Sequence, residues 1–72
     1  MNAPPHETLL VNGETRTLPA GSTVDDVVAL VAPVRTGIAV ALNGDVIPRS
    51  AWPATTLAAG DQLEVLTAAQ GG

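Results

Sequence analysis

Two Asn-Gly dipeptides constrain the fold of this chain more than any other feature. Asn12-Gly13 stands between two β-prone runs, residues 8–11 and 14–18. A type I′ turn requires positive φ at both central residues, and Asn-Gly meets that requirement with little strain, so it is the strongest short-range hairpin signal. Asn43-Gly44 follows a second apolar run, residues 37–42. We therefore predict two tight β-turns, with both asparagines acting as turn formers.

A short helix is predicted directly after the first hairpin. Thr23 is a suitable N-cap, and Asp26 stands three residues on, at the capping-box position. Apolar residues then recur at the i, i+3, i+4, i+7 spacing of one helix face: Val24, Val27, Val28 and Val31. Valine is a mediocre helix former, so packing against a sheet must stabilise this helix. Pro33 is expected to end it.

The remaining segments complete an α+β chain. Residues 45–47 are predicted as a short strand, residues 48–53 as a loop or single helical turn, and residues 62–67 as a last, alternating strand. The single helix is the one element able to cover the apolar face of the sheet. Its valines are expected to pack on inward-facing strand residues, namely Leu9, Val11, Val40, Leu42, Leu63 and Val65.

The chain length allows one domain only. With 72 residues and 46% apolar content, it can form one small core. We expect a disordered N-terminal tail at residues 1–7, a folded domain at residues 8–67 and a flexible C-terminal tail at residues 68–72. No apolar run approaches the length of a membrane span, and no basic segment precedes an apolar stretch. The expected location is therefore cytoplasmic.

Charge and residue usage exclude several classes of function. The net charge of −4, with three arginines and no lysine, argues against binding to nucleic acid or to an anionic membrane, and is compatible with a basic protein partner. The chain has no cysteine, and its single histidine, His6, lies in the predicted tail. A metal site, a bound cofactor and a catalytic residue set are therefore not expected, and the chain is not expected to be an enzyme.

The motif that carries chemistry is the terminal pair Gly71-Gly72. Glycine has no Cβ, so such a tail can adopt backbone angles closed to other residues and enter a narrow active site. Its carboxylate is unhindered for attack on the α-phosphorus of ATP, and the resulting acyl-adenylate is open to a sulfur nucleophile. A Gly-Gly pair that follows the last strand of a small domain resembles the C-terminus of ubiquitin-like proteins. The resemblance implies that Gly71 threads into a partner and that the carboxylate of Gly72 reacts.

A longer pattern resembles the ThiS family, the sulfur carriers of thiamine biosynthesis. It consists of Asn43, Ile47-Pro48-Arg49, Trp52, Leu57, Gly60-Asp61, Leu63 and Gly71-Gly72. The Pro-Arg-x-x-Trp element distinguishes it from the molybdopterin-type carrier. The resemblance implies a β-grasp fold, a mixed sheet of four to five strands wrapped on one helix.

The resemblance also implies a mechanism and partners. A ubiquitin-activating-like adenylyltransferase would use ATP to adenylate Gly72, and sulfur derived from a cysteine desulfurase would then replace AMP. The product is a covalent 1-thioglycine, a thiocarboxylate, from which thiazole synthase takes the sulfur. The carrier is expected to be a monomer when free. Two alternatives stay open: a carrier for another pathway such as molybdopterin synthesis, and a β-grasp interaction module whose Gly-Gly is inert.

Docking residues are predicted from the alternation of the last strand. If Leu63 and Val65 face the core, Leu66 points outward or lies at the rim of the sheet, beside the tail. Docking candidates are Leu66 with Leu10 and Ala41, and Glu64 as a complementary charge. Arg49 is interpreted either as a member of a surface ion pair or as a partner contact. Trp52, the one aromatic residue, is interpreted as a core residue that anchors its loop.

Overall fold

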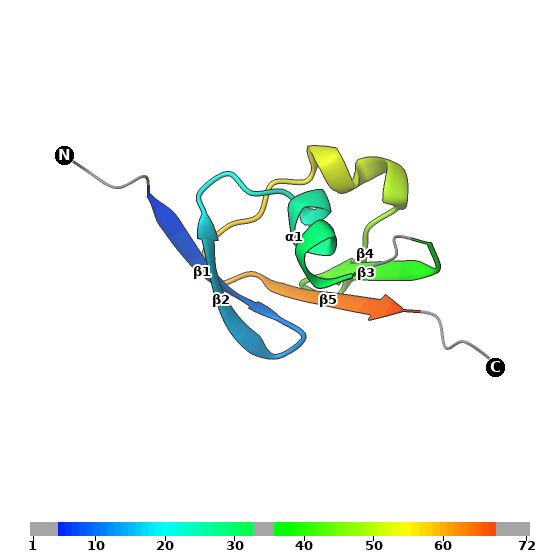
Figure 1. Cartoon of the computed structure of the whole chain (residues 1–72), viewed down its shortest axis with the longest axis horizontal. Coiled ribbons are helices and arrows are strands. Elements are labelled where there is room, and N and C mark those ends of the chain that lie inside the picture. Colours follow the sequence, from blue (N-terminus) through cyan, green and yellow to red (C-terminus); the bar gives the residue numbers. More distant parts are fainter. Residues whose placement is uncertain (1–4, 33–35, 68–72) are drawn as a thin grey trace.

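The computed structural model describes residues 5–32 and 36–67. Its elements in chain order are β1 (His6–Val11), β2 (Glu14–Pro19), α1 (Val24–Val31), β3 (Ile38–Leu42), β4 (Asp45–Val46), the 3₁₀ helix η1 (Arg49–Ala54) and β5 (Gln62–Thr67). The five strands form one sheet in the order β2-β1-β5-β3-β4, with α1 across one face (Figure 1). Only the β1–β5 pairing is parallel, so the sheet is mixed. The predicted α+β class and β-grasp arrangement are confirmed.

Both predicted hairpin turns are present. The central residues have positive φ in each turn: 52° and 80° at Asn12 and Gly13, and 51° and 89° at Asn43 and Gly44. These values match the requirement of a type I′ turn. The turns fix the register of their strands, pairing β1 with β2 and β3 with β4 so that core-facing and outward-facing residues each share one side.

The helix begins at the predicted residue because a complete capping box holds its first turn. The Thr23 hydroxyl accepts from the Asp26 backbone N–H at 3.2 Å, and the Asp26 carboxylate accepts from the Thr23 N–H at 2.9 Å. The helix ends at Val31, where the N–H of Ala32 donates to the Val28 carbonyl at 2.9 Å. The predicted stop at Pro33 lies outside the described residues.

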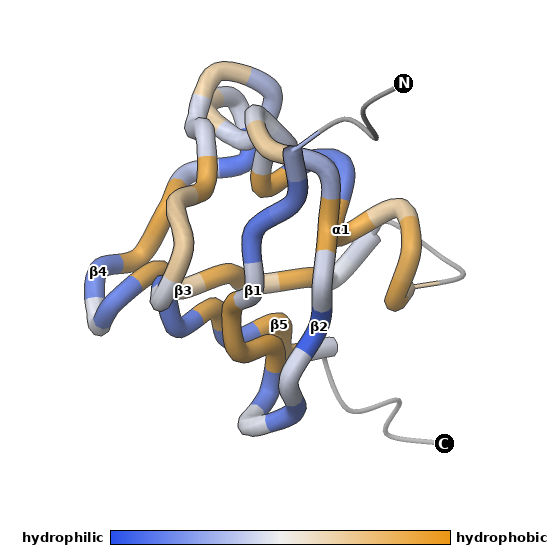
Figure 2. The backbone as a smooth tube through the Cα atoms, turned by 90° about the vertical axis from the view of Figure 1, so that its left-hand side faces the viewer, coloured by the Kyte–Doolittle hydropathy of each residue, from blue (hydrophilic) through white to orange (hydrophobic). Residues whose placement is uncertain are grey.

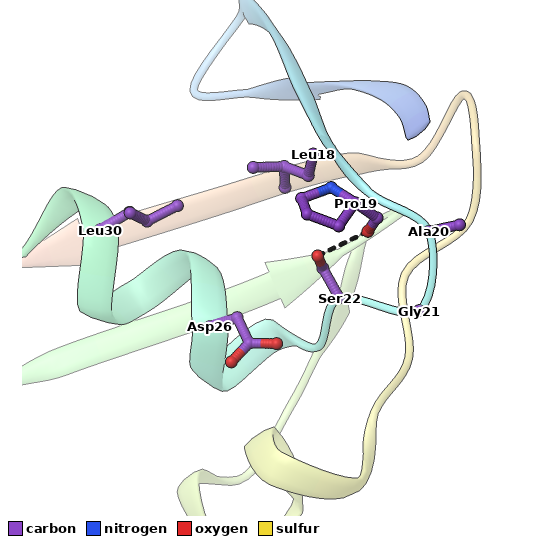
Figure 3. Close-up of a pocket in the computed structure, with 7 residues that line it drawn as sticks. All are labelled: Leu18, Pro19, Ala20, Gly21, Ser22, Asp26 and Leu30. Carbon is purple, nitrogen blue, oxygen red and sulfur yellow. Dashed lines mark hydrogen bonds between the residues drawn. The ribbon is translucent and has the colours of Figure 1, made fainter. Parts of the chain in front are cut away.

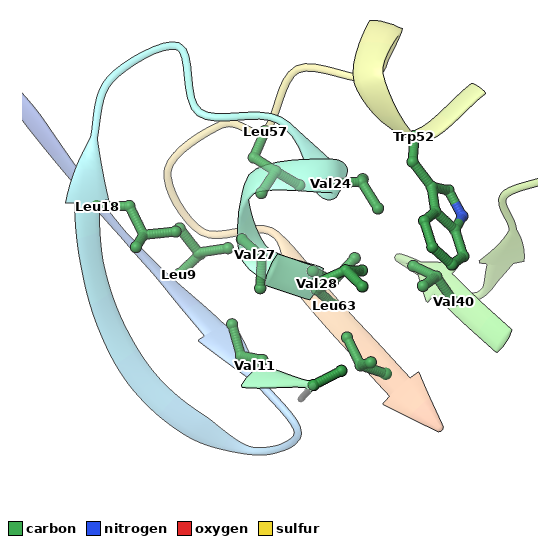
Figure 4. Packing of buried hydrophobic residues seen from close by; sticks show 12 residues of the cluster. Leu9, Val11, Leu18, Val24, Val27, Val28, Val40, Trp52, Leu57 and Leu63 are labelled. Atoms are coloured by element: carbon green, nitrogen blue, oxygen red, sulfur yellow. The ribbon is translucent and has the colours of Figure 1, made fainter. Parts of the chain in front are cut away.

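The core lies between α1 and the sheet (Figure 4). The predicted valine face is confirmed: Val24, Val27 and Val28 are buried and Val31 is partly buried. The predicted strand residues join it, with Leu42 only partly buried, together with Leu18, Ala32, Trp52 and Leu57. Trp52 is 1% exposed, and its indole N–H donates to the Ile47 carbonyl at 3.0 Å. It therefore anchors the loop as predicted.

The first strand begins two residues earlier than predicted. His6 and Glu7, assigned above to the tail, belong to β1, opposite Pro19 and Leu18 of β2. The Ala20 N–H also donates to the Pro5 carbonyl at 3.0 Å. The ladder continues past the expected break because β2 is an edge strand, where a proline that lacks an N–H is tolerated. Residues 1–4 and 68–72 lie outside the described residues, so the predictions of tails there are not tested.

Candidate functional site

The site centres on β5, which lies between β1 and β3 and leads toward the C-terminus (Figure 1). Thr67 is the last residue that the structure describes. The predicted reactive residues, Gly71 and Gly72, follow it and lie outside the described residues. The structure describes the folded surface around β5, the strand that precedes these two glycines in the sequence.

The Gly60-Asp61 element of the sequence pattern shapes the turn before β5. Gly60 has a φ of 85°, which favours glycine. The Asp61 carboxylate accepts from the Ala58 N–H at 2.8 Å and from the Asn43 amide at 3.0 Å. The Asn43 side-chain oxygen accepts from the Gln62 N–H at 2.9 Å. This element therefore fixes where β5 begins, and its carboxylate is occupied by these bonds.

The sheet face opposite α1 carries the predicted docking residues. Leu66 is 62% exposed while Leu63 and Val65 are buried, so the predicted alternation is confirmed. In the sheet register Leu66 lies opposite Ala39, and Glu64 lies opposite Ala41. We call this surface the open sheet face and define it by Leu10, Ala39, Ala41, Val46, Glu64 and Leu66. Leu10 and Ala41 are half-buried, and Glu64 is exposed.

Sequence reasoning missed Val46, which is 77% exposed on the same face. Val46 lies opposite Ala41 in the β3–β4 pairing. A two-residue turn at Asn43-Gly44 fixes that register, so the turn and the alternation together could have placed Val46 beside Ala41. Figure 2 shows how hydrophobic and hydrophilic residues follow one another along β3, β4 and β5.

Arg49 lies at one end of this surface. Its guanidinium carbon is 5.8 Å from the centroid of the Trp52 ring, within the range of a cation–π contact. Within the described part of the chain, no ion pair joins Arg49 to a carboxylate; the pair found there is Arg16–Glu14, at 4.0 Å. Arg49 also lines a hollow of about 330 Å³ with Ile38, Leu66 and Thr67. A charged group thus stands beside the most exposed apolar part of β5.

A second hollow, of about 450 Å³, lies between β2 and α1 (Figure 3). Its polar groups serve the local fold: the Ser22 hydroxyl donates to the Pro19 carbonyl at 2.6 Å, and Asp26 caps the helix. Leu30 forms part of its rim. Among residues 5–32 and 36–67, no three His, Cys, Asp or Glu side chains gather as metal ligands, and no helix is long and apolar enough to cross a membrane.

In the part of the chain that the structure describes, the α-helix α1 packs on a five-stranded mixed sheet whose central strand precedes the Gly71-Gly72 pair of the sequence. This arrangement defines a β-grasp domain of the ubiquitin-like class. The sequence model of the ThiS family matches residues 9–72. The chain therefore belongs to the ThiS family of sulfur carriers, as the resemblance predicted.

Two solved structures are similar to this chain over most of its length. The crystal structure of the thiamine biosynthesis protein ThiS from Geobacter metallireducens is 35% identical, covers 90% of this chain and 99% of its own, and has a TM-score of 0.76. An NMR solution structure of a thiamine biosynthesis protein from the same organism is 32% identical, with coverage of 90% and 87% and a TM-score of 0.71. A comparison with curated proteins found no match.

Proposed function

We propose that this protein carries sulfur as a thiocarboxylate on Gly72 and donates it for thiazole formation in thiamine biosynthesis. The observation that carries the proposal is that the family match extends through the terminal Gly71-Gly72. The similarity to a thiamine biosynthesis protein over 90% of the chain supports the pathway. The same similarity favours thiazole formation over molybdopterin synthesis.

The proposed chemistry takes place on partner enzymes. A carboxylate oxygen of Gly72 attacks the α-phosphorus of ATP, and pyrophosphate leaves. A thiol reductant releases the persulfide sulfur of a cysteine desulfurase as hydrosulfide and is itself oxidised to a disulfide. The hydrosulfide then attacks the carbonyl carbon of the acyl-adenylate, and the oxygen leaves on AMP. Thiazole synthase accepts the sulfur. The carrier has no cysteine and one histidine, so we assign it the role of a protein substrate rather than an enzyme.

Intact mass measurement tests this function. The full chain is incubated with ATP, its adenylyltransferase and a sulfur source. We expect a mass gain equal to one sulfur minus one oxygen, located in the C-terminal peptide. An unchanged mass would leave an inert β-grasp module as the better description.

The open sheet face is the proposed docking surface for the adenylyltransferase. Ordering a tail costs backbone entropy, roughly 1–2 kcal/mol per residue, so apolar area on the folded body must supply affinity. Leu66 is exposed and adjoins the tail. Glu64 supplies a negative charge for basic groups of the partner and acts mainly on the association rate. Leu10, Ala41 and Arg49 are proposed to lie at the borders of the contact.

We predict that Leu66→Asp lowers kcat/KM for adenylation about tenfold or more, because it removes buried apolar contact and places a charge in the interface. The effect should appear in the KM for the carrier. The thermal midpoint should change little, since Leu66 is exposed. Steady-state ATP–pyrophosphate exchange at subsaturating carrier measures the first quantity.

Leu30 supplies the matched control for this prediction. It is 64% exposed, nearly as much as Leu66 at 62%, but it lies on α1, on the other side of the sheet. Leu30→Asp should leave adenylation unaltered. Equal losses in the two variants would indicate a general effect of charge, and the open sheet face would no longer be the docking surface.

A further inference from the structure

Asn12 makes contacts that a turn-forming residue does not need. Its side-chain oxygen accepts from the backbone N–H of Val65 at 2.8 Å, and its side-chain N–H donates to the Val65 carbonyl at 3.2 Å. Its own backbone N–H donates to the Leu63 carbonyl at 2.9 Å. One residue of the first hairpin turn therefore holds β5 at two alternate residues, Leu63 and Val65, the second of them 53 residues away along the chain.

The Asn12 side chain gives the Val65 backbone the hydrogen bonds that a neighbouring strand would otherwise supply. The parallel pairing of β1 with β5 covers Leu10–Gln62 and Val11–Leu63, and β1 then turns away at Asn12. The next residue of β5 facing that side is Val65. The Asn12 amide offers Val65 an acceptor and a donor, as a continued strand would.

The other neighbour of β5 cannot make the same contacts. Val65 lies opposite Val40 in the antiparallel pairing with β3. Because both main-chain groups of Val65 are directed to Asn12, this is a non-hydrogen-bonded pair, and the bonds to β3 belong to the residues on either side. Removal of the Asn12 side chain thus leaves the Val65 backbone without a protein partner, immediately before Leu66 and Thr67.

We propose that Asn12 is a positioning residue for the transfer reaction: its amide fixes the direction in which β5 presents Leu66 and Thr67 to the adenylating enzyme. This inference rests on the proposed function. Asn12 does not touch the reacting carboxylate. It acts by reducing the number of orientations that the end of β5 can adopt before the enzyme binds it. Its loss should therefore raise the KM for the carrier.

Asn43 provides a matched control. It also opens an Asn-Gly turn, its φ of 51° is close to the 52° of Asn12, and its side chain also accepts from a β5 backbone N–H. That N–H belongs to Gln62, at the end of β5 remote from the tail. Glycine at either position preserves the positive φ and removes only the side-chain amide.

The experiment compares Asn12→Gly with Asn43→Gly. Amide hydrogen exchange should accelerate about fivefold or more at Val65 and beyond in Asn12→Gly, and at Gln62 in Asn43→Gly. In ATP–pyrophosphate exchange with the adenylating enzyme, the KM of Asn12→Gly should rise about five- to tenfold with kcat within about twofold. Asn43→Gly should change KM by less than about twofold. Asn12→Asp, which keeps the acceptor and loses the donor, should lie between Asn12→Gly and the parent protein.

Other outcomes overturn the inference. An equal rise in KM for both glycine variants indicates a general loss of stability, and an unchanged KM in Asn12→Gly shows that the contacts do not serve the reaction. Unaltered exchange at Val65 shows that Asn12 does not hold β5. If the parent protein is not adenylated at all, the proposed function fails, whereas exchange at Leu66 and Thr67 still decides whether Asn12 orders the end of β5.

Discussion

Deletion of Gly72 is expected to abolish thiocarboxylate formation while the thermal midpoint stays within about 1 °C of the parent protein. The deletion leaves a terminal carboxylate on Gly71, but it withdraws that carboxylate by one residue, about 3.3–3.6 Å in an extended chain. A misplacement of about 1 Å can already reduce a reaction rate a hundredfold. All buried residues of the described part of the chain precede Thr67, so the deletion leaves each of them in place. Intact mass and calorimetry measure the two outcomes.

Gly72→Ala is the companion variant for this deletion. It keeps the carboxylate in place and adds only a Cβ, so it separates the position of the reacting group from the need for an unhindered backbone. We expect thiocarboxylate formation to slow about tenfold or more without being abolished. Sulfur transfer by the truncated protein at the parent rate would disprove the role of Gly72 as the site of attachment.

The local elements of this fold could be predicted because each has a short-range cause. The turn at Asn12-Gly13 follows from positive φ, and the start of α1 follows from the Thr23–Asp26 capping box. The order of the strands could not be predicted in this way. The parallel contact of β1 with β5 joins the two ends of the chain, and no sequence window contains both partners. The family resemblance supplied that arrangement.

The same distinction holds for the candidate site. The exposure of Leu66 followed from alternation within one strand. The contacts of Asn12 with Val65 did not, because an Asn-Gly turn fully accounts for an asparagine at that position. Only the sheet register shows that β1 ends at Val11, opposite Leu63, whereas β5 continues to Thr67. The hollow beside Arg49 likewise depends on β3 and β5 lying side by side.

The second large effect is expected from Val28→Asp, which should prevent stable folding. Val28 is 0% exposed, between α1 and the sheet. A carboxylate buried there without a partner costs several kcal/mol, and a domain of this size has a total stability of about 5 kcal/mol. Val28→Ala, which removes only methyl groups, should cost roughly 1–3 kcal/mol and remain folded. Urea unfolding followed by circular dichroism measures both variants.

Leu30→Asp isolates burial as the cause, because it places the same carboxylate on the same helix two residues later, where the side chain is 64% exposed. Its remaining effects are a negative charge near the C-terminal end of the helix dipole and repulsion from Asp26 one turn earlier, together about 1 kcal/mol. The difference between the two aspartate variants therefore measures the packing of α1 on the sheet. If Val28→Asp folds as stably as Leu30→Asp, the valine face of α1 does not form the core. The packing of β5 against that face would then have to be revised as well.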